Sequence, residues 1–273
     1  MNHAQMENDF IRPIFEKDYV PVVMALNENF IPVLSVFLLS VIDHSEKTHN
    51  YDFVILSRGI SKENKRRILN LIHNHKNFSI RFINVSKYFK GKKLFIHEHF
   101  SIETYFRLLI PDKLSAYSKV LYLDADMIVN RDIYDLYHVD LEDCTLGAVR
   151  DIGLLSFAIE YKDTRRTLKK IVKMKNIYQY FNAGVMIINV KKLAGKYSFA
   201  QLLQIAASRK WPTVDQDVLN HLFEGETKIL DMSWNVMFDY MDRMKMTRKL
   251  GAKYYMEYME ARKQPYKIHI AES

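Results

Sequence analysis

Short apolar runs recur along the chain, and most are followed by a polar loop and a longer stretch with helical length or spacing. Residues 20–26 (VPVVMAL) form the first run, polar residues follow at 27–29, and an apolar helix is expected at 30–42. Further strands are predicted at 51–56, 79–85, 120–123, 146–149 and 183–189, and further helices at 61–76, 198–208 and 215–223. Strands that alternate with helices predict an α/β fold with a mostly parallel central sheet and helices on both faces.

Two carboxylates, Asp124 and Asp126, stand one residue apart at the end of the strand predicted at 120–123. Side chains alternate along a strand, so both can converge on one point if the extended geometry continues through them. Ligands of open α/β sheets bind beyond the carboxyl ends of the strands, and two hard oxygen ligands there suit Mg²⁺ or Mn²⁺. In the alternative interpretation one acid caps a turn and the other is solvated, and a second Asp-x-Asp occurs at Asp215 and Asp217.

Composition narrows the class of protein and of partner. The 273 residues, 48% of them hydrophobic, suffice for a sizeable core, and the small numbers of Gly (8) and Pro (6) leave no obvious linker, which favours one domain with a C-terminal appendage. A formal net charge of +8 favours an anionic partner such as a nucleotide, a nucleic acid or a lipid surface. The only cysteine, Cys144, excludes an intrachain disulfide and favours a reducing compartment.

Several motifs that would indicate other functions are absent from the sequence. It contains neither the Gly-x-x-x-x-Gly-Lys-Ser/Thr phosphate loop nor a Gly-x-Gly-x-x-Gly after a strand, and it lacks the His-Glu-x-x-His of zinc proteases. The His-Glu-His at 97–99 has no cysteine nearby and is interpreted as a surface loop. No run of about 18 apolar residues is present and no basic-then-apolar signal opens the sequence, so a cytoplasmic location is expected.

Seven segments in order resemble the family 8 retaining glycosyltransferases, which include bacterial lipopolysaccharide galactosyl- and glucosyltransferases and glycogenin. They are VVMALNENF, SIETYFRLLIPDKL, KVLYLDADMIVNRDI, LGAVRD, YFNAGVMIINVKKL, VDQDVLNHLF and KIHIA, and they run from about Val20 to the last residues. The resemblance implies a GT-A fold in a single catalytic domain of residues 1–273. A nucleotide-sugar-binding sheet would occupy about residues 19–232, and a basic helical appendage ending in the strand with His269 would occupy about residues 233–273.

The resemblance also implies a metal site. Asp124, Ala125 and Asp126 match the Asp-x-Asp segment that holds a divalent cation against the donor diphosphate, and His269 in KIHIA matches the third protein ligand. An imidazole beside two carboxylates favours Mn²⁺, with Mg²⁺ as the alternative. Without the resemblance, His269 would be interpreted as a structural or solvated side chain.

Residues after the first predicted strand are similar to the family loop that contacts uridine. They are Ala25, Asn27, Asn29 and Phe30. The usual family pattern is Ala-x-Asp-x-Asn-Tyr, so Asn27 replaces an acid and Phe30 replaces a tyrosine. Phe30 can still stack on a base and the Asn27 amide can pair with an imide edge, although Phe30 could equally be the first core residue of its helix.

Residues from four further segments match family positions around the donor sugar and diphosphate. They are Arg107, Asp151, Asn182, Ala183 with Gly184, Asp215 and Gln216. Arg107 lies in a mostly apolar segment, where a buried guanidinium needs an anionic partner; the alternative is a surface arginine. For Asp215 the alternative is a helix N-cap.

The implied reaction moves glucose or galactose from UDP-glucose or UDP-galactose to a hydroxyl of a glycan or lipid-linked acceptor, with retention, as in lipopolysaccharide or other cell-surface glycan synthesis. Gln216, Asp215 and Asp151 are the expected catalytic residues. A retaining hydrolase places a carboxylate nucleophile below the anomeric carbon, but Gln216 matches that position and is a poor nucleophile. Attack from the face of the leaving group is therefore favoured.

Two other classes of protein stay open from the sequence. One is a metal-dependent nucleotidyltransferase, which also uses paired aspartates. The other is a non-catalytic basic module that binds nucleotides or nucleic acid. That module would leave the acids at the strand end unexplained, because carboxylates repel phosphates unless a metal intervenes. No nucleic-acid partner is therefore expected.

Two basic stretches suggest contact with a membrane surface. Residues 161–175 hold seven Lys or Arg against one Asp, and residues 241–267 hold eight against three acids. They could contact the inner face of an anionic membrane that carries the acceptor, or be solvated helix surfaces.

The family pattern continues past the histidine with a glycine and a Lys-Pro-Trp segment, whereas Glu272 and Ser273 end this sequence. The chain is therefore expected to be shortened at its C-terminus, and in that form to bind nucleotide but to turn over its substrate poorly.

Overall fold

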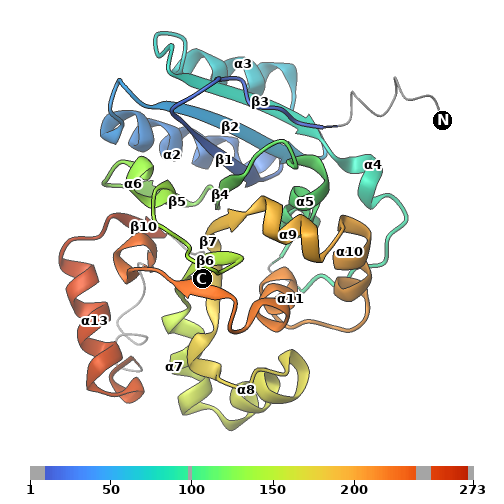
Figure 1. The fold of residues 1–273 in the computed structure, drawn as a ribbon, viewed down its shortest axis with the longest axis vertical. Coiled ribbons are helices and arrows are strands. Elements are labelled where there is room, and N and C mark those ends of the chain that lie inside the picture. The colour runs from blue at the N-terminus through green and yellow to red at the C-terminus, as the bar shows by residue number, and fades with distance from the viewer. Residues whose placement is uncertain (1–9, 98–99, 238–246, 270–273) are drawn as a thin grey trace.

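A seven-stranded sheet forms the centre of the computed structural model, which describes residues 10–97, 100–237 and 247–269 (Figure 1). The strand order is β3-β2-β1-β4-β7-β6-β8. The strands are β1 Tyr19–Ala25, β2 Asn50–Ser57, β3 Phe78–Asn84, β4 Lys119–Leu123, β6 Leu146–Arg150, β7 Phe181–Asn189 and β8 Thr227–Ile229. In this sheet β7 is antiparallel to β4 and β6 and the other four adjacent pairs are parallel, which confirms the prediction of a mostly parallel sheet.

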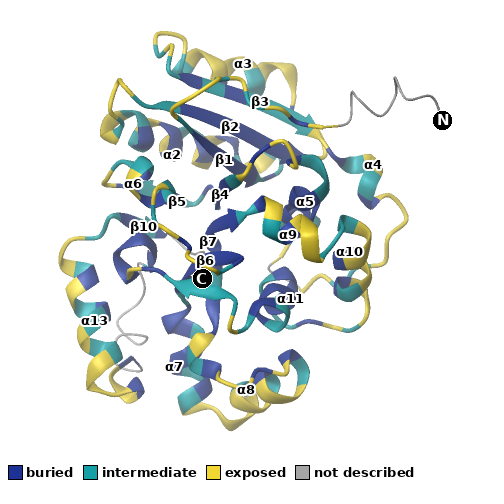
Figure 2. Cartoon of the chain, viewed as in Figure 1, coloured by how far each residue is buried: buried dark blue, intermediate teal, exposed yellow. Residues whose placement is uncertain are grey.

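Helices cover both faces of this sheet because its strands are apolar on both sides. In β1, Val22 packs into one cluster of buried side chains with Phe37, whereas Val23 packs into another with Tyr105. The first cluster is covered by α2 Ile31–His44, α3 Lys62–Leu71 and α6 Ile133–Tyr137, and the second by the 3-10 helix η3 Ile102–Leu109 with α9 Val190–Lys196, α10 Phe199–Ala207 and α11 Val214–Phe223. Figure 2 shows the buried strands between the exposed outer surfaces of helices, so the predicted layering is confirmed.

The remaining helical elements are mostly short. They are η2 Glu28–Phe30, α4 Ser86–Phe89, α5 Ile110–Lys113, α7 Ile152–Glu160, α8 Lys162–Thr167 with the π-helical turn η4 Leu168–Val172, η5 Ile177–Gln179, η6 Met232–Asn235, η7 Arg248–Leu250 and α13 Ala252–Lys263. α7 and α8 lie at the end of the molecule opposite α3 (Figure 1). Within the three described ranges, no helix combines the length and the apolar character needed to cross a bilayer.

A small second sheet joins the C-terminal segment to the middle of the chain. It consists of β5 Met127–Val129, β10 Lys267–His269 and β9 Val236–Met237, in that order. β10 is antiparallel to β5 and parallel to β9, and His269 lies opposite Met127 in the register. The last described strand of the predicted appendage therefore pairs with the strand that follows the Asp-x-Asp segment.

The antiparallel direction of β7 places its first residues at the carboxyl end of β4. Leu123, the last residue of β4, lies opposite Val185 of β7. The preceding residue Gly184 accepts a hydrogen bond on its carbonyl oxygen from the Asp124 backbone N–H at 2.9 Å. The start of β7 and the segment after β4 are thereby joined at the carboxyl ends of the parallel strands, where ligands of such sheets bind.

Candidate functional site

A cavity of about 970 Å³ opens beyond the carboxyl ends of β1, β4 and β6. All but one of the predicted site residues line it: Ala25, Asn27, Phe30, Arg107, Asp124, Ala125, Asp126, Asp151, Asn182, Ala183, Asp215, Gln216 and His269. The exception is Asn29, which is exposed and whose backbone N–H donates to Asn27 Oδ1 at 2.9 Å. Neighbouring side chains of a 3-10 turn point in directions about 120° apart, so the turn that holds Asn27 and Phe30 at the cavity directs Asn29 away.

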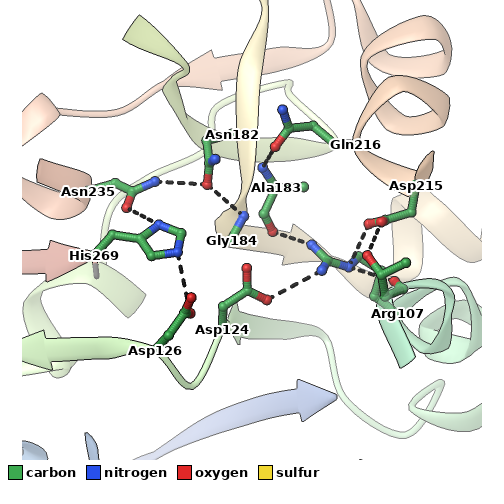
Figure 3. A network of polar contacts seen from close by, with 11 residues as sticks. Arg107, Asp124, Asp126, Asn182, Ala183, Gly184, Asp215, Gln216, Asn235 and His269 are labelled. Carbon is green, nitrogen blue, oxygen red and sulfur yellow. Dashed lines mark hydrogen bonds and ion pairs between the residues drawn. The ribbon is translucent and has the colours of Figure 1, made fainter. Parts of the chain in front are cut away.

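Asp124, Asp126 and His269 form a group that could hold a metal ion. One ligand atom from each lies within 4.8 Å of the other two, and His269 Nε2 is 3.3 Å from Asp126 Oδ1 (Figure 3). β4 ends at Leu123, and the chain bends through residues 124–126 before it enters β5. The expected cause of convergence, an extended strand through both acids, was therefore wrong. The bend, together with β10 beside β5, brings the three side chains together.

The protein surroundings shift the ionisation of this group. Burial alone would raise the pKa of Asp126, but its interactions with His269, with the backbone and with Lys267 together outweigh burial and lower it. Lys267, two residues before His269, is fully buried, and burial lowers its pKa to about 7 against the pull of Asp124 and Asp126. Its Nζ has no hydrogen-bond partner among the described residues. This lysine was not among the predicted site residues. The one feature of the sequence that points to it is its position two residues before His269.

Gly184 leaves the space that this group needs. A Cβ atom built at Gly184 would lie 2.6 Å from Asp124 Oδ2, 2.9 Å from Asn182 Oδ1 and 3.1 Å from His269 Cε1. The missing side chain therefore lets the backbone of β7 approach both the candidate metal-binding group and Asn182. Two carboxylates and an imidazole are a donor set that suits Mn²⁺, so the residues present fit a divalent cation.

Replacing Gly184 with alanine is expected to weaken Mn²⁺ binding by at least about tenfold, because the new methyl group would push Asp124 out of position. Electron paramagnetic resonance titration of free Mn²⁺ measures this directly. Gly195→Ala is the matched control, since among the described residues no atom outside the local helix backbone and the chain neighbours lies within 4 Å of its Cβ position. Equal Mn²⁺ affinity of the two variants would show that the close approach at Gly184 does not matter for the ion.

Arg107 links the candidate metal-binding group to Asp215 and to the start of β7. Its guanidinium lies with Nε 2.8 Å from Asp215 Oδ2 and Nη2 3.3 Å from Asp124 Oδ1, and Nη1 donates to the Ala183 carbonyl oxygen. The group also lies 4.1 Å from the ring centre of Tyr122. Burial alone would lower the pKa of Arg107, but the Asp215 carboxylate reverses this and raises it. The surface interpretation of this arginine was wrong, because its side chain is 6% exposed.

Asp215 is a buried acid in the first turn of α11. Thr213 occupies the N-cap position, so the N-cap interpretation of Asp215 was wrong. The Thr104 hydroxyl donates to Asp215 Oδ1, and burial raises the pKa of Asp215 to about 6 despite the nearby charge of Arg107. At neutral pH Asp215 is therefore a carboxylate that balances the buried guanidinium. Asp217, the other acid of this Asp-x-Asp, accepts instead from the Thr213 backbone N–H at 2.8 Å.

Gln216 and Asp151 hold each other in the wall of the cavity. The Gln216 Oε1 atom accepts from the Ala183 backbone N–H at 2.9 Å, and Nε2 donates to Asp151 Oδ2 at 3.0 Å and to the Tyr180 hydroxyl at 3.2 Å. The other Asp151 oxygen accepts from the Leu154 backbone N–H at 2.8 Å and caps α7. Both ends of the Gln216 amide are thus engaged, and the position of the side chain is fixed.

Asn27 and Phe30, the residues predicted to contact a base, both line the cavity. Phe30 is partly buried, lines the cavity and packs against the core cluster of α2, so its packing role holds and its place on the cavity wall leaves base stacking as a prediction. The Asn27 oxygen accepts from Asn29, which leaves the Asn27 amide N–H groups for a ligand. Base recognition by this pair stays a prediction.

The structure adds Asn235 and an apolar rim to the predicted site. Asn235 is 5% exposed and contacts both His269 and Asn182. It lies in the segment MSWN, outside the matched motifs, and no local pattern distinguishes it. The apolar cavity residues include Val33, Val36, Phe100, Leu154, Phe157 and Met237, and from sequence alone they are indistinguishable from core side chains.

Comparison with known proteins gives curated relatives along most of the chain. The lipopolysaccharide 1,2-glucosyltransferase of Escherichia coli strain K12 is 30% identical over 52% of this chain and 40% of its own length. Glycosyltransferase GlyF of Streptococcus pneumoniae is 27% identical over 79% of this chain and 48% of its own length. The chain thus spans about half the length of these two relatives.

Solved structures agree with the fold and the family. The WbbM bifunctional glycosyltransferase superposes with a TM-score of 0.87 at 32% identity, over 97% of this chain and 47% of that one. The galactosyltransferase LgtC, in complex with donor and acceptor sugar analogues, gives 0.72 at 28% identity over 93% and 87%. The GT-A fold that the sequence predicted is confirmed. Because the profile of glycosyl transferase family 8 matches residues 21–264, the chain belongs to that family.

Proposed function

We propose that this chain is a retaining hexosyltransferase that moves glucose or galactose from a UDP-sugar to a hydroxyl of a glycan or lipid-linked acceptor. The proposal rests on the grouping of Asp124, Asp126 and His269 in a cavity whose wall carries Arg107. A cation site beside a fixed positive charge suits a departing diphosphate. Family membership and the similarity to a galactosyltransferase with donor and acceptor analogues support it.

Asp124, Asp126 and His269 would hold the divalent cation, which supplies charge neutralisation at the leaving diphosphate when it is bound. Mn²⁺ is favoured over Mg²⁺ because an imidazole belongs to the group. Arg107 contributes a second positive charge that needs no reorganisation, since Asp215 and the Ala183 carbonyl already fix its guanidinium. In a cavity from which water is excluded, such a preorganised charge acts more strongly than it would in solution.

Asp151, Asn182 and Gln216 would orient the transferred sugar. Gln216 accepts from the Ala183 backbone N–H, so its oxygen is committed and it is a poor nucleophile. We therefore favour attack on the same face as the leaving group. The bond from the anomeric carbon to the β-phosphate oxygen breaks, the acceptor oxygen bonds to that carbon, and the acceptor proton passes to the released phosphate.

The purified chain tests this function directly. UDP release from UDP-glucose and UDP-galactose is expected with Mn²⁺ and is expected to disappear with EDTA. Pyrophosphate release from UTP would instead indicate a nucleotidyltransferase, and preferential binding of an oligonucleotide over UDP would indicate a non-catalytic module. If neither UDP nor a UDP-sugar raises the melting temperature in the presence of Mn²⁺, the proposed donor class is wrong.

The proposed setting is the cytoplasmic synthesis of lipopolysaccharide or another cell-surface glycan. The similarity to a lipopolysaccharide 1,2-glucosyltransferase supports this choice. Product analysis with candidate acceptors would identify the acceptor class. The expectations about the last residues of the sequence, and about part of the second basic stretch, fall outside the described residues.

A basic surface on α8 and the turn after it supports peripheral contact with an anionic membrane. Its members are all exposed and have no ion pair among the described residues: Lys162, Arg165, Arg166, Lys169, Lys170, Lys173 and Lys175. The preceding helix α7 contributes Leu154 and Phe157 to the cavity. A membrane held at α8 would thus lie close to the cavity side of α7, where a lipid-linked acceptor could enter.

Replacing four of these residues (Lys162, Arg165, Arg166 and Lys169) with glutamine is expected to weaken partitioning onto vesicles rich in anionic lipid about a hundredfold or more, because each basic residue contributes about 1 kcal/mol at such a surface. Vesicle flotation at low salt measures the partitioning. The control variant removes four positive charges from α3 (Lys62, Lys65, Arg66 and Arg67), at the opposite end of the molecule. Equal losses in both variants, or no dependence on anionic lipid, would exclude α8 as the contact surface.

A further inference from the structure

Asn235 connects the metal-binding group to the sugar pocket through two hydrogen bonds. Its Oδ1 atom lies 3.1 Å from His269 Nδ1, and its Nδ2 donates to Asn182 Oδ1 at 2.9 Å (Figure 3). The same Asn182 oxygen accepts from the Gly184 backbone N–H at 2.9 Å. Asn235 is 5% exposed and lies at the end of η6, directly before β9. Its two contacts therefore join three segments that are distant in the sequence.

The hydrogen bonds run from Gly184 through Asn182 and Asn235 to His269, and the bond at Gly184 determines the direction of the others. The Gly184 backbone N–H can only donate, so the Asn182 atom that faces it must be the carbonyl oxygen. The Asn235 atom that faces this oxygen must then be the amide nitrogen, which turns the Asn235 oxygen towards His269. An amide oxygen only accepts, so a hydrogen bond between a neutral His269 ring and Asn235 requires the ring proton to be on Nδ1.

The opposite ring nitrogen, Nε2, then keeps its lone pair. It lies 3.3 Å from Asp126 Oδ1, within the group that also includes Asp124. Without the Asn235 oxygen, the neutral ring could instead carry its proton on Nε2 and donate it to Asp126. His269 and Asp126 would then be hydrogen-bonded to each other, and neither the Nε2 lone pair nor that Asp126 oxygen would face a cation. The Asn235 oxygen opposes this competing arrangement.

We propose that Asn235 is a positioning residue that fixes the Nδ1–H tautomer of His269 before any ion binds, and that through Asn182 it aligns the metal-binding group with the sugar pocket. The inference rests on the proposed metal-binding role of His269. Its first consequence, the position of a proton on one imidazole ring, exists in the metal-free protein. It can therefore be measured even if the proposed function fails.

Nitrogen-15 NMR of the metal-free full chain reads the tautomer. At about pH 8.5, above the ordinary histidine pKa of about 6.5, the long-range couplings of His269 are expected to show Nδ1–H, and Asn235→Ala is expected to shift the ring towards Nε2–H. The sequence has 10 histidines, and the spectrum of His269→Gln assigns the signal. An Nε2–H tautomer in the unaltered protein, or an unchanged tautomer in Asn235→Ala, would overturn the inference.

Mn²⁺ binding supplies the second measurement. Asn235→Ala is expected to weaken Mn²⁺ binding by about 10- to 100-fold, the usual effect of removing a hydrogen-bond partner of a metal ligand. Asn235→Asp keeps an acceptor for Nδ1–H but loses the donor to Asn182, so its Mn²⁺ affinity is expected to stay near that of the unaltered protein while turnover of the UDP-sugar falls. A purely structural role for Asn235 would lower both quantities in both variants.

Asn130→Ala is the matched control. Asn130 is exposed, and its amide donates to the Pro265 carbonyl oxygen at 3.1 Å, so it also anchors the segment before β10 but does not reach His269. Its loss is expected to leave both the tautomer and the Mn²⁺ affinity unchanged. If Asn130→Ala weakens Mn²⁺ binding as much as Asn235→Ala does, general anchoring of β10 explains the effect and the inference fails. If the unaltered protein binds no Mn²⁺, the proposed function fails while the tautomer result still stands.

Discussion

Replacing Asp126 with asparagine is expected to lower UDP release from the donor sugar by about a thousandfold, which corresponds to about 4 kcal/mol of lost transition-state stabilisation. The amide removes one negative charge from a group of three ligands whose atoms lie within 4.8 Å of one another. It also changes the side chain that faces His269 Nε2 at 3.3 Å. Steady-state UDP release at saturating Mn²⁺, together with Mn²⁺ titration, measures both consequences.

Asp135→Asn is the control for this prediction. Asp135 is an acid on α6 whose side chain is 46% exposed and pairs with Arg131 outside the cavity. This control is expected to leave turnover within about twofold, since isolated surface pairs contribute little. Full activity and unchanged Mn²⁺ affinity in both Asp124→Asn and Asp126→Asn would remove the metal assignment.

Replacing Arg107 with methionine is expected to destabilise the fold by about 3–5 kcal/mol at neutral pH, because the change leaves the Asp215 carboxylate buried without its partner. Asp215 is 2% exposed, and its carboxylate lies 2.8 Å from Arg107 Nε. The melting temperature should fall by on the order of 10 °C for a chain of this size. Arg131→Met, which breaks an exposed pair with Asp135, is expected to change stability by less than about 1 kcal/mol.

The cost of Arg107→Met should depend on pH in a defined direction. Burial already raises the pKa of Asp215 from its ordinary 3.8 to about 6, and loss of Arg107 raises it further. A buried acid with a raised pKa stabilises the fold fully below its unfolded pKa and loses that contribution as pH rises through its folded pKa. The variant should therefore be closer in stability to the unaltered protein at pH 5 than at pH 8. A difference that does not change with pH would mean that the unpaired Asp215 charge is not the cause.

A double variant separates stability from activity. Arg107→Met combined with Asp215→Leu removes both charges, and replacing a buried ion pair by apolar side chains is often neutral or stabilising. Melting temperature is expected to recover in large part, whereas UDP release stays low because the positive charge near the diphosphate is gone. Recovery of both would show that Arg107 only balances Asp215.

The long strands were predictable because burial on both faces leaves a local record. β1, β2 and β4 consist of nearly continuous apolar residues, and such runs stand out from their polar surroundings without knowledge of their partners. β5, β9 and β10 have three residues or fewer, too few for any period to appear. They form only because the C-terminal segment returns to pair beside the bend after β4.

The residues of the candidate site also fall into two groups, those that a local sequence pattern indicates and those that it does not. The two acids at the end of β4 were visible from residue type and position, although the geometry that joins them is a bend and not a strand. His269 was found through resemblance, because one histidine carries no spacing pattern of its own. The pairing of Arg107 with Asp215 and the contacts of Asn235 had no local signal at all, since each partner lies on a different element.

For this protein, residue order was enough to indicate the layered fold, the strand-end acids and the family, because burial and chemistry act there through neighbours along the chain. Only the tertiary structure determines the polar contacts of the site. Folding brings the start of β7, the end of η6 and the strand β10 around Asp124 and Asp126. Hydrogen-bond direction, charge balance and the space left at Gly184 depend on distances of a few ångströms between remote segments. No pattern within a single segment can encode such distances.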